Sequence, residues 1–471
     1  MRASAPEVLE NNFPAASDAA PFNKAGPQET PPLPTTVETW LLAPLSAPDF
    51  SLHDLTGQTR TLSALRGQAV LLNFWTTRSA SCQQDLRIFN QLHPRWASSG
   101  LQLLTVNLDG LREEDTADAE SVRATVRELH LSFPILHGSD DVAGIYNILY
   151  RYLFDRHRDL GLPTSFLISA KGDIVKVYQG PTDPAHIGRD FRQIPQTPAE
   201  RLAVALPFPG VIDSLEFRRN YLSYGSVYFQ RDYFDQAEAS FQRTLDDDPS
   251  SAEALYGLGS VYLKQGKTAE ARKSFEGAIK LHANYPDTLP NAWNNLGLLA
   301  TREGHTAEAI PYFQEALRLS PEHLIALDNL GNAYRQQKQW DEARQTLERA
   351  VRVSPEDPEA NYSLGMVFAQ LDASDRAYEY LLKALKFRPG YPEALNNLGV
   401  LYLRTQRRDE AVASFEECIH VAPAFDQSYL NLARVYALEG ASDKARTVLL
   451  ELLKQHPNQT QGKKMLGELG R

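Results

Sequence analysis

The chain contains very little cysteine. Only two cysteines, Cys82 and Cys418, occur among its 471 residues, and they lie in different segments. So small a number excludes a fold held together by a framework of disulfides. The 11 histidines are scattered, and the sequence has no CxxC or HxxxH spacing. Because metals are usually held by such clusters, we expect no metal site, and nothing in the sequence indicates a cofactor.

The chain also lacks a basic excess and long apolar runs. Its net charge is −11, which argues against nucleic acid as a partner because no surplus of lysine and arginine exists to neutralise phosphates. No apolar run is long enough to cross a bilayer, so no membrane span is predicted. The first residues contain no apolar core of a secretory signal. The sequence as given therefore predicts a cytoplasmic protein.

What is present suits a soluble protein of several domains, since 42% of the residues are hydrophobic and 23% are charged. Residues 1–45 are rich in Pro, Ala, Thr and Ser, which predicts a disordered leader. In residues 46–190 apolar strand-like runs alternate with helical patterns, which predicts an α/β domain. Residues 191–217 carry many prolines and are predicted to be a linker with one short helix.

From about residue 218 the sequence repeats itself. Its Leu-Gly positions recur at a constant step, with one longer step after the second, as the sequence shows at Gly225, Gly259, Gly297, Gly331, Gly365 and Gly399. An Ala recurs in the same register, as at Ala271 and Ala309, and a Phe or Leu follows it, as at Phe313. A period of 34 with these residues is the signature of the tetratricopeptide (TPR) repeat, a helical hairpin that stacks into a solenoid. We therefore predict seven TPR repeats and a closing helix in residues 218–471, forming an all-α superhelix.

A row of polar residues lies two positions before these glycines and before Ala433, which takes the place of the glycine in the seventh repeat. It includes Ser223, Asn295, Asn329, Ser363, Asn397 and Asn431, and the neighbouring groove positions include Asn294, Asp328, Asn332, Asn396 and Arg404. Each asparagine amide offers donors and an acceptor to a peptide backbone, so these asparagines are predicted to bind a protein or peptide in the groove. The alternative is that asparagine is simply common at this repeat position. No row of lysines and arginines appears, so a clamp for carboxylates is not predicted.

Residues 74–82 read FWTTRSASC and resemble the active-site turn of thioredoxin-type proteins, which carries two cysteines. The resemblance covers residues 46–190 and includes the PDFSL segment, the GLPT stretch at 161–164 and the hairpin KGDIVKVYQG. It is to the redoxin group, which contains the TlpA/ResA-like reductases and the peroxiredoxin-like AhpC/TSA proteins. The resemblance implies a thioredoxin-like fold in which Pro163 forms a cis peptide bond and faces the active-site thiol. It also implies that Ser79 stands in place of the attacking cysteine and Cys82 in place of the resolving cysteine.

Three interpretations of Ser79 and Cys82 remain open. In the first, the site is degenerate and the domain serves as a scaffold, because a serine hydroxyl cannot replace the attacking thiolate. In the second, Cys82 is a peroxidatic thiol of a Ser-x-x-Cys motif, although Trp75 stands where peroxiredoxins carry a proline. In the third, Cys82 exchanges thiols alone with glutathione or a partner.

The hypothesis that these observations favour is a protein–protein interaction scaffold made of a redoxin-like domain and a TPR array. The alternative is a peroxiredoxin-like or one-thiol oxidoreductase that uses Cys82 and recruits partners through the array. Redoxin domains of this type are often exported, so an extracytoplasmic location is expected if the N-terminus is truncated.

Overall fold

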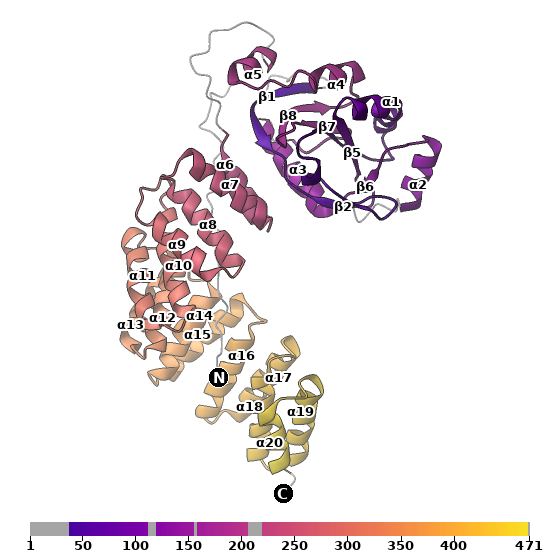
Figure 1. Ribbon diagram of the computed structural model, residues 1–471. Coiled ribbons are helices and arrows are strands. Elements are labelled where there is room, and N and C mark those ends of the chain that lie inside the picture. The colour runs from indigo at the N-terminus through magenta and orange to yellow at the C-terminus, as the bar shows by residue number, and fades with distance from the viewer. Residues whose placement is uncertain (1–36, 112–118, 155–157, 206–218, 470–471) are drawn as a thin grey trace, which may run out of the picture. The chain divides into compact units, whose positions relative to one another are not determined.

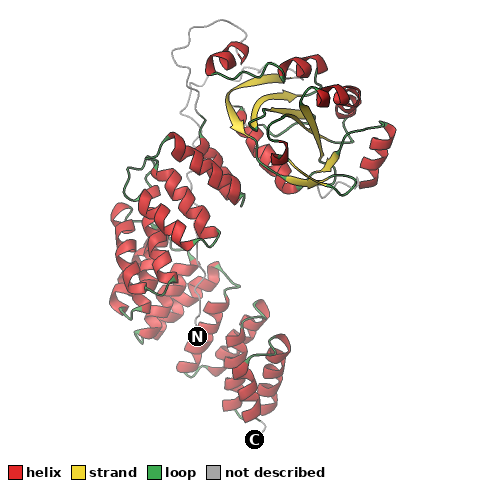
Figure 2. Ribbon diagram, in the orientation of Figure 1, coloured by secondary structure: helices red, strands yellow, loops and turns green. Residues whose placement is uncertain are grey.

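The computed structural model describes residues 37–111, 119–154, 158–205 and 219–469 (Figure 1). They divide into two compact units, with the boundary between Pro249 and Ser250. The first unit contains a mixed sheet with its helices and one further helical hairpin, and the described part of the second unit contains helices only (Figure 2). This confirms the predicted fold class, an α/β thioredoxin-like domain followed by an all-α TPR array.

The main sheet has six strands in the order β1-β8-β7-β4-β5-β6. Strand β4 lies in its interior, parallel to β5 and antiparallel to β7. Both faces of β4 are covered, so Val70 through Trp75 are all buried, which explains its unalternating apolar sequence. The strands are β1 (Val37–Ser46), β4 (Ala69–Trp75), β5 (Leu101–Asn107), β6 (Ile135–His137), β7 (Thr164–Ile168) and β8 (Asp173–Gln179), with a separate ribbon of β2 (Ser51–His53) and β3 (Thr59–Thr61).

Helices cover both faces of this sheet. On one face, α1 (Ala80–Ser98), α2 (Ala119–Glu128) and α4 (Pro184–Asp190) share a core with Leu71 and Trp75. On the other face, Tyr146 of α3 (Asp140–Leu153) packs on Phe74 and Phe166, with ring centroids 5.0 and 5.6 Å away. The side chains of β4 therefore alternate between two cores, and the loop after Trp75 delivers α1 to the first of them.

The structure corrects the predicted limits of this domain. The expected leader, 1–45, is too long, because β1 pairs with β8 from Val37 onward and completes one edge of the sheet. At the other end, the short helix expected in the linker is α5 (Pro198–Ala205), and Arg201 donates to the carbonyl of Leu42 in β1 at 2.9 Å. Residues 1–36 of the leader and 206–217 of the linker lie outside the described residues.

Seven helical hairpins and a closing helix follow in the described residues. The first hairpin, α6 (Tyr221–Gln230) and α7 (Phe234–Asp247), belongs to the first unit. The second unit contains α8 (Ala252–Lys264), α9 (Thr268–Ala278), α10 (Thr288–Arg302), α11 (Thr306–Leu319), α12 (Leu324–Gln336), α13 (Trp340–Val353), α14 (Pro358–Gln370), α15 (Ser374–Phe387), α16 (Pro392–Arg404), α17 (Arg408–Val421), α18 (Asp426–Leu438), α19 (Ser442–Gln455) and α20 (Thr460–Glu468).

The close approach of the two helices in a hairpin explains the repeat pattern. At Gly297 of α10, an added Cβ would lie 2.5 Å from the Phe313 ring of α11. Glycine is therefore required for its lack of a side chain, and the ring of Phe313 fills the space that this leaves. Phe313 and Ala309 of α11 are completely or almost completely buried in the hairpin.

Candidate functional site

The thioredoxin-like site lies at the N-terminus of α1. Ser79 is the N-cap of this helix, and its hydroxyl accepts a hydrogen bond from the backbone N–H of Cys82 at 3.3 Å. Serine is among the preferred N-cap residues because its oxygen satisfies a helix N–H that has no partner within the helix. The residue at the position of the attacking cysteine thus has a structural role in this chain.

Cys82 is completely buried. Its side chain belongs to the core formed by Leu71, Trp75 and Leu86. Burial raises the pKa of the thiol, a side-chain hydrogen bond of the Ser79 hydroxyl with the thiol opposes that shift, and the carboxylates of Asp85 and Asp109 add to it. The thiol is therefore protonated at neutral pH and shielded from solvent. Cys418 is buried as well, and its Sγ donates to the carbonyl of Pro392 at 3.3 Å.

Asp85 lies one turn further along α1 and is only 1% exposed. Its Oδ1 accepts a hydrogen bond from the backbone N–H of Thr182 at 3.2 Å, and its Oδ2 has no partner among the described residues. Burial raises the pKa of this carboxyl to about 6, with the Thr182 bond opposing the shift. Asp85 can therefore bind or release a proton near neutral pH beside Cys82.

Asp109 fastens the loop that precedes α1. It accepts hydrogen bonds from the Thr76 hydroxyl, from the Thr77 backbone N–H at 2.9 Å and from the Asn107 amide at 2.9 Å. Burial alone would raise the pKa of Asp109, but these hydrogen bonds together lower it. The carboxylate is thus ionised, and it connects the ends of β4 and β5 where the loop to α1 begins.

Pro163 has the conformation that the resemblance implies. The Leu162–Pro163 bond is cis, and Leu162 packs against the core that contains Cys82. Thr164 pairs with Phe74 in the register of β7 and β4, so Pro163 lies beside the end of β4 from which the site loop departs. The sheet therefore brings Ser79, Cys82 and Pro163 to one end of the domain, as predicted for a thioredoxin fold.

In the second unit, predicted groove asparagines bond to one another across neighbouring repeats. Asn329 donates from Nδ2 to Oδ1 of Asn294 at 2.9 Å, and Asn431 donates to Asn396 in the same way, also at 2.9 Å. Asn397 donates to the Tyr362 hydroxyl at 2.8 Å. The partners in each bond come from adjacent repeats, so these amides link successive first helices of the hairpins.

The remaining predicted asparagines differ in exposure. Asn294, Asn396 and Asn431 are buried, with exposures of 4%, 6% and 5%. Asn295 and Asn332 are half-buried. The Oδ1 of Asn332 accepts from Arg335 and from Ser363, both at 3.2 Å. The row predicted for peptide binding thus also holds the array together, and its use for a ligand stays a prediction.

Sequence reasoning missed Asp85 and Asp109. A signal for Asp85 was present, because it lies three positions after Cys82 on the face of α1 that carries Leu86 and Phe89. An acidic residue on such an apolar face predicts an unusual environment. Asp109 follows the end of β5, and only the fold shows that this point meets the loop before α1.

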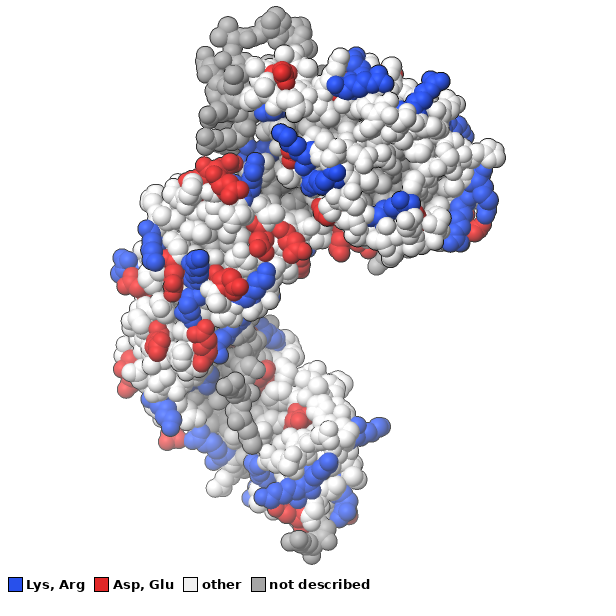
Figure 3. All heavy atoms as spheres, viewed as in Figure 1, with Lys and Arg blue, Asp and Glu red and all other residues white. Residues whose placement is uncertain are grey.

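No membrane-spanning helix and no metal cluster occurs within the described residues. None of the described helices is both long and apolar enough to cross a membrane. No group of three or more His, Cys, Asp or Glu side chains in that part of the chain could hold a metal ion. Acidic and basic side chains are intermixed over the visible face of the protein (Figure 3).

Comparison with known families assigns both regions. Residues 45–177 match the model of the AhpC/TSA family. Residues 213–390 match the cilia and flagella-associated protein 70 C-terminal domain, and residues 392–417 and 407–469 match models of the tetratricopeptide repeat.

Curated relatives share the first region. Thiol-disulfide oxidoreductase ResA of Geobacillus kaustophilus is 31% identical over 160 residues, which cover 34% of this chain and 82% of that protein. Thioredoxin-like protein YneN of Bacillus subtilis is 30% identical over 28% of this chain and 69% of its own length. Among solved structures, YrrB, described as a TPR protein with an unusual peptide-binding site, is 24% identical over 41% of this chain and 98% of its own, with a TM-score of 0.33.

The sheet order, the helix α1 that begins after Ser79 and the cis proline before β7 define a thioredoxin-like redoxin domain, and the hairpins define a TPR array. The chain belongs to the redoxin family that includes the ResA thiol-disulfide oxidoreductases. Its repeats mark it as a redoxin with a region for protein–protein interaction.

Proposed function

We propose that this protein is an interaction scaffold whose redoxin domain keeps the fold of its relatives without their dithiol chemistry. The observation that carries the proposal is the pairing of a capping serine at position 79 with a completely buried thiol at Cys82. Disulfide exchange begins when an accessible thiolate attacks a disulfide sulfur. The site offers a hydroxyl where that sulfur is needed.

Electrostatics around Cys82 support this proposal. A thiolate formed there would be buried and would lie near the carboxyl groups of Asp85 and Asp109, and all three effects raise the pKa of the thiol. The N-terminus of α1 favours a negative charge. The Ser79 hydroxyl lowers the pKa of the thiol too, but burial raises it by more. Cys82 is therefore better suited to packing than to attack.

The TPR array supplies the binding function in this proposal. An asparagine amide has two N–H donors and an oxygen that accepts two hydrogen bonds, so one lateral bond does not exhaust it. Asn329 uses one N–H for Asn294 and retains its other N–H and its oxygen for a ligand. Half-buried amides such as Asn329 and Asn397 are thus suited to hold the backbone of an extended peptide.

Thiol accessibility tests the scaffold proposal directly. We expect neither cysteine of the native protein to react with Ellman's reagent on the timescale of minutes, and both to react in urea. The variant Ser79→Cys should gain one reactive thiol when reduced, form an intramolecular disulfide with Cys82 when oxidised, and catalyse the reduction of insulin by dithiothreitol. A fast-reacting Cys82 in the unaltered protein would contradict the proposal.

A one-thiol oxidoreductase remains the second candidate, and two observations favour it. The relatives are thiol-disulfide oxidoreductases, and Asp85 is a buried carboxyl with a pKa of about 6 that could take up the proton of Cys82. The test is peroxide consumption and glutathione exchange by the unaltered protein and by Cys82→Ser. Activity lost in Cys82→Ser would establish this function, and equal background rates would eliminate it.

Peptide binding in the groove has its own test. Peptides selected by display against the full-length protein should bind Asn329→Ala/Asn397→Ala several-fold more weakly, as measured by fluorescence anisotropy. Asn458→Ala, an exposed asparagine outside the row, is the matched control and should bind unchanged. Equal affinities for all three proteins would remove the asparagine row from the proposal.

A further inference from the structure

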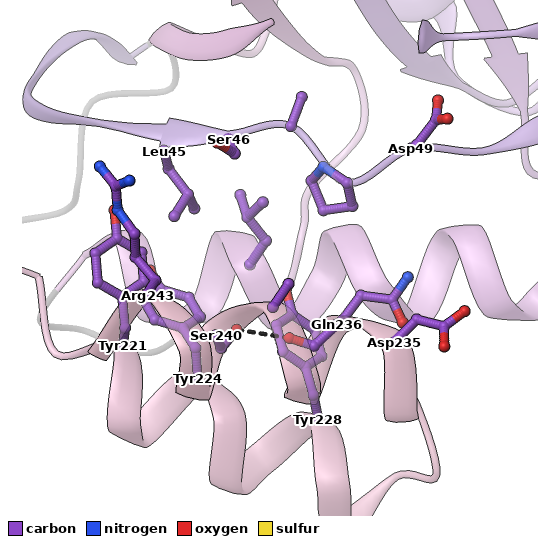
Figure 4. A pocket seen from close by; sticks show the side chains of 14 residues that line it. Leu45, Ser46, Asp49, Tyr221, Tyr224, Tyr228, Asp235, Gln236, Ser240 and Arg243 are labelled. Atoms are coloured by element: carbon purple, nitrogen blue, oxygen red, sulfur yellow. Dashed lines mark hydrogen bonds between the residues drawn. The ribbon is translucent and has the colours of Figure 1, made fainter. Parts of the chain in front are cut away.

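A cavity of about 430 Å³ lies within the first unit, between the redoxin domain and the hairpin α6–α7. One wall is the chain from Leu45 to Asp49, at the end of β1, and Leu149 of α3 adjoins it. The opposite wall consists of side chains of α6 and α7, as Figure 4 shows. This volume lies in the range of sites that bind small molecules.

Direct contacts between the two walls fix the shape of this cavity. The Tyr228 hydroxyl of α6 donates to the carbonyl of Ile145 in α3 at 3.5 Å. The ring of Tyr152 at the end of α3 packs on Tyr224, with centroids 5.8 Å apart. Gly144 lies so close to Tyr233 that an added Cβ would be 2.2 Å from its hydroxyl. The cavity is therefore part of a packed interface within one compact unit.

The polar groups at one end of the cavity are mainly hydrogen-bond donors. Tyr224 is only 4% exposed, and its hydroxyl makes no hydrogen bond of ordinary geometry among the described residues, although the Arg219 guanidinium lies near enough to moderate its raised pKa. The guanidinium of Arg243 lies over the Tyr221 ring, 5.9 Å from its centroid, and is exposed at that end of the cavity. A buried phenol with hydrogen-bonding capacity to spare and a nearby arginine favour an acceptor with a negative charge.

The acidic groups lie toward the other end of the cavity (Figure 4). Asp49 already accepts a hydrogen bond from the backbone N–H of Ser63 at 2.7 Å. Asp235 is exposed in the first turn of α7. Between the two ends, Leu45, Pro48 and Leu149 give the redoxin side of the cavity an apolar lining, and Gln236 and Ser240 of α7 lie on the other side.

We propose that this cavity binds an aromatic carboxylate. The carboxylate binds Arg243 and accepts the hydrogen bond of Tyr224, and the ring lies between the tyrosines of α6 and the apolar wall of the redoxin domain. Two sources share this chemistry: a free aromatic acid, and the C-terminal phenylalanine or tyrosine of a protein chain. The proposal depends neither on the redox state of the α1 site nor on the asparagine row, so its failure would leave the proposed function intact.

Ligand-observed NMR with the full-length protein tests the proposal. We expect 3-phenylpropionate to bind, and 3-phenylpropanol and 3-phenylpropylamine to bind at least tenfold more weakly. A tripeptide ending in phenylalanine with a free carboxylate, compared with its amide, tests the second source. If the tripeptide acid binds more tightly than 3-phenylpropionate, a protein C-terminus is the ligand; if it fails to bind, a free acid is.

Variants connect the binding to this cavity. Arg243→Gln should weaken the binding of 3-phenylpropionate about five- to tenfold, since the ligand loses a charge-assisted hydrogen bond to an exposed arginine. Tyr224→Phe should weaken it about threefold while leaving the ring and the fold in place. Arg352→Gln, on α13 of the other unit, is the matched control and should bind as the unaltered protein does. Equal binding by all variants, or tighter binding of the amine, would overturn the proposal.

Discussion

The side-chain oxygen of Ser79 can stabilise the start of α1 but cannot take part in thiol exchange. Its oxygen caps α1, a role in which serine stabilises a helix by about 1 kcal/mol relative to a residue that cannot cap. The same oxygen cannot form the mixed disulfide through which thiol exchange proceeds. In the scaffold function proposed above, oxygen in place of sulfur keeps the helix start and leaves this position without an attacking thiol.

The burial of Asp85 makes the free energy of unfolding depend on pH. Its pKa is about 6 in the folded chain and 3.8 when unperturbed, so the folded state binds more protons between these values. The free energy of unfolding should therefore fall as the pH rises from about 4 to 6, by about 2–3 kcal/mol, and then level off. Asp85→Asn should remove this dependence and stabilise the protein at pH 7, as measured by urea unfolding.

The exposed Asp247 supplies the control for this experiment. Asp247→Asn should follow the same pH profile as the unaltered protein. If Asp85→Asn were less stable than the unaltered protein at pH 7, the carboxylate would be the favoured form in the fold, contrary to the environment that its burial creates.

At the scale of elements, the spacing of glycine and phenylalanine sets how closely two helices approach. Gly297→Ala places a methyl group 2.5 Å from Phe313, so the ring or the helix must move. We expect a loss of about 1–2 kcal/mol, because the cost of overpacking exceeds the better helix propensity of alanine. Thermal unfolding followed by circular dichroism measures this as a lower midpoint.

Gly467 of α20 is the matched control, since a Cβ there would meet nothing within 4 Å. Gly467→Ala should leave the midpoint unchanged or raise it slightly. Equal effects of the two substitutions would mean that helix propensity, and not the contact with Phe313, governs position 297.

Most of the helices and strands could be predicted from the sequence. The repeat period, with its one longer step, predicted the hairpins, because each repeat position has one physical role that its residue type reveals. The unbroken apolar run at 69–74 predicted the buried β4 for a similar reason. The edge strand β1 was missed, since the sequence of Val37–Ser46 contains a proline and follows a leader-like composition. Its pairing with β8, at the far end of the domain sequence, is a tertiary contact that no local pattern contains.

At the scale of the whole molecule, the first hairpin packs on the redoxin domain as one compact unit. The repeat pattern assigned α6 and α7 to the array and could not show that Tyr228 would contact Ile145. Likewise the sequence indicated Ser79, Cys82 and Pro163, because each lies in a short local motif. It did not indicate Asp109 or the cavity. Those features depend on side chains that only the fold brings together.

Gly144 provides a test of this packing. Gly144→Leu would insert a large side chain where even a Cβ lies 2.2 Å from the Tyr233 hydroxyl. We expect the hairpin α6–α7 to separate from the redoxin domain, with faster amide hydrogen exchange in α6 and unchanged exchange in β4 and β7. Gly188→Ala, whose Cβ meets nothing within 4 Å, is the control. Unchanged exchange in α6 would show that the hairpin does not need this contact.

The lateral bonds between asparagines of adjacent repeats have a mechanical consequence. The hydrogen bonds Asn294–Asn329 and Asn396–Asn431 each join two neighbouring repeats of the array. A bound peptide that takes one of these amides away from its partner would break the hydrogen bond between the two repeats. Peptide binding would then make the array more flexible at that point, because the same amides would bind the peptide and join the repeats.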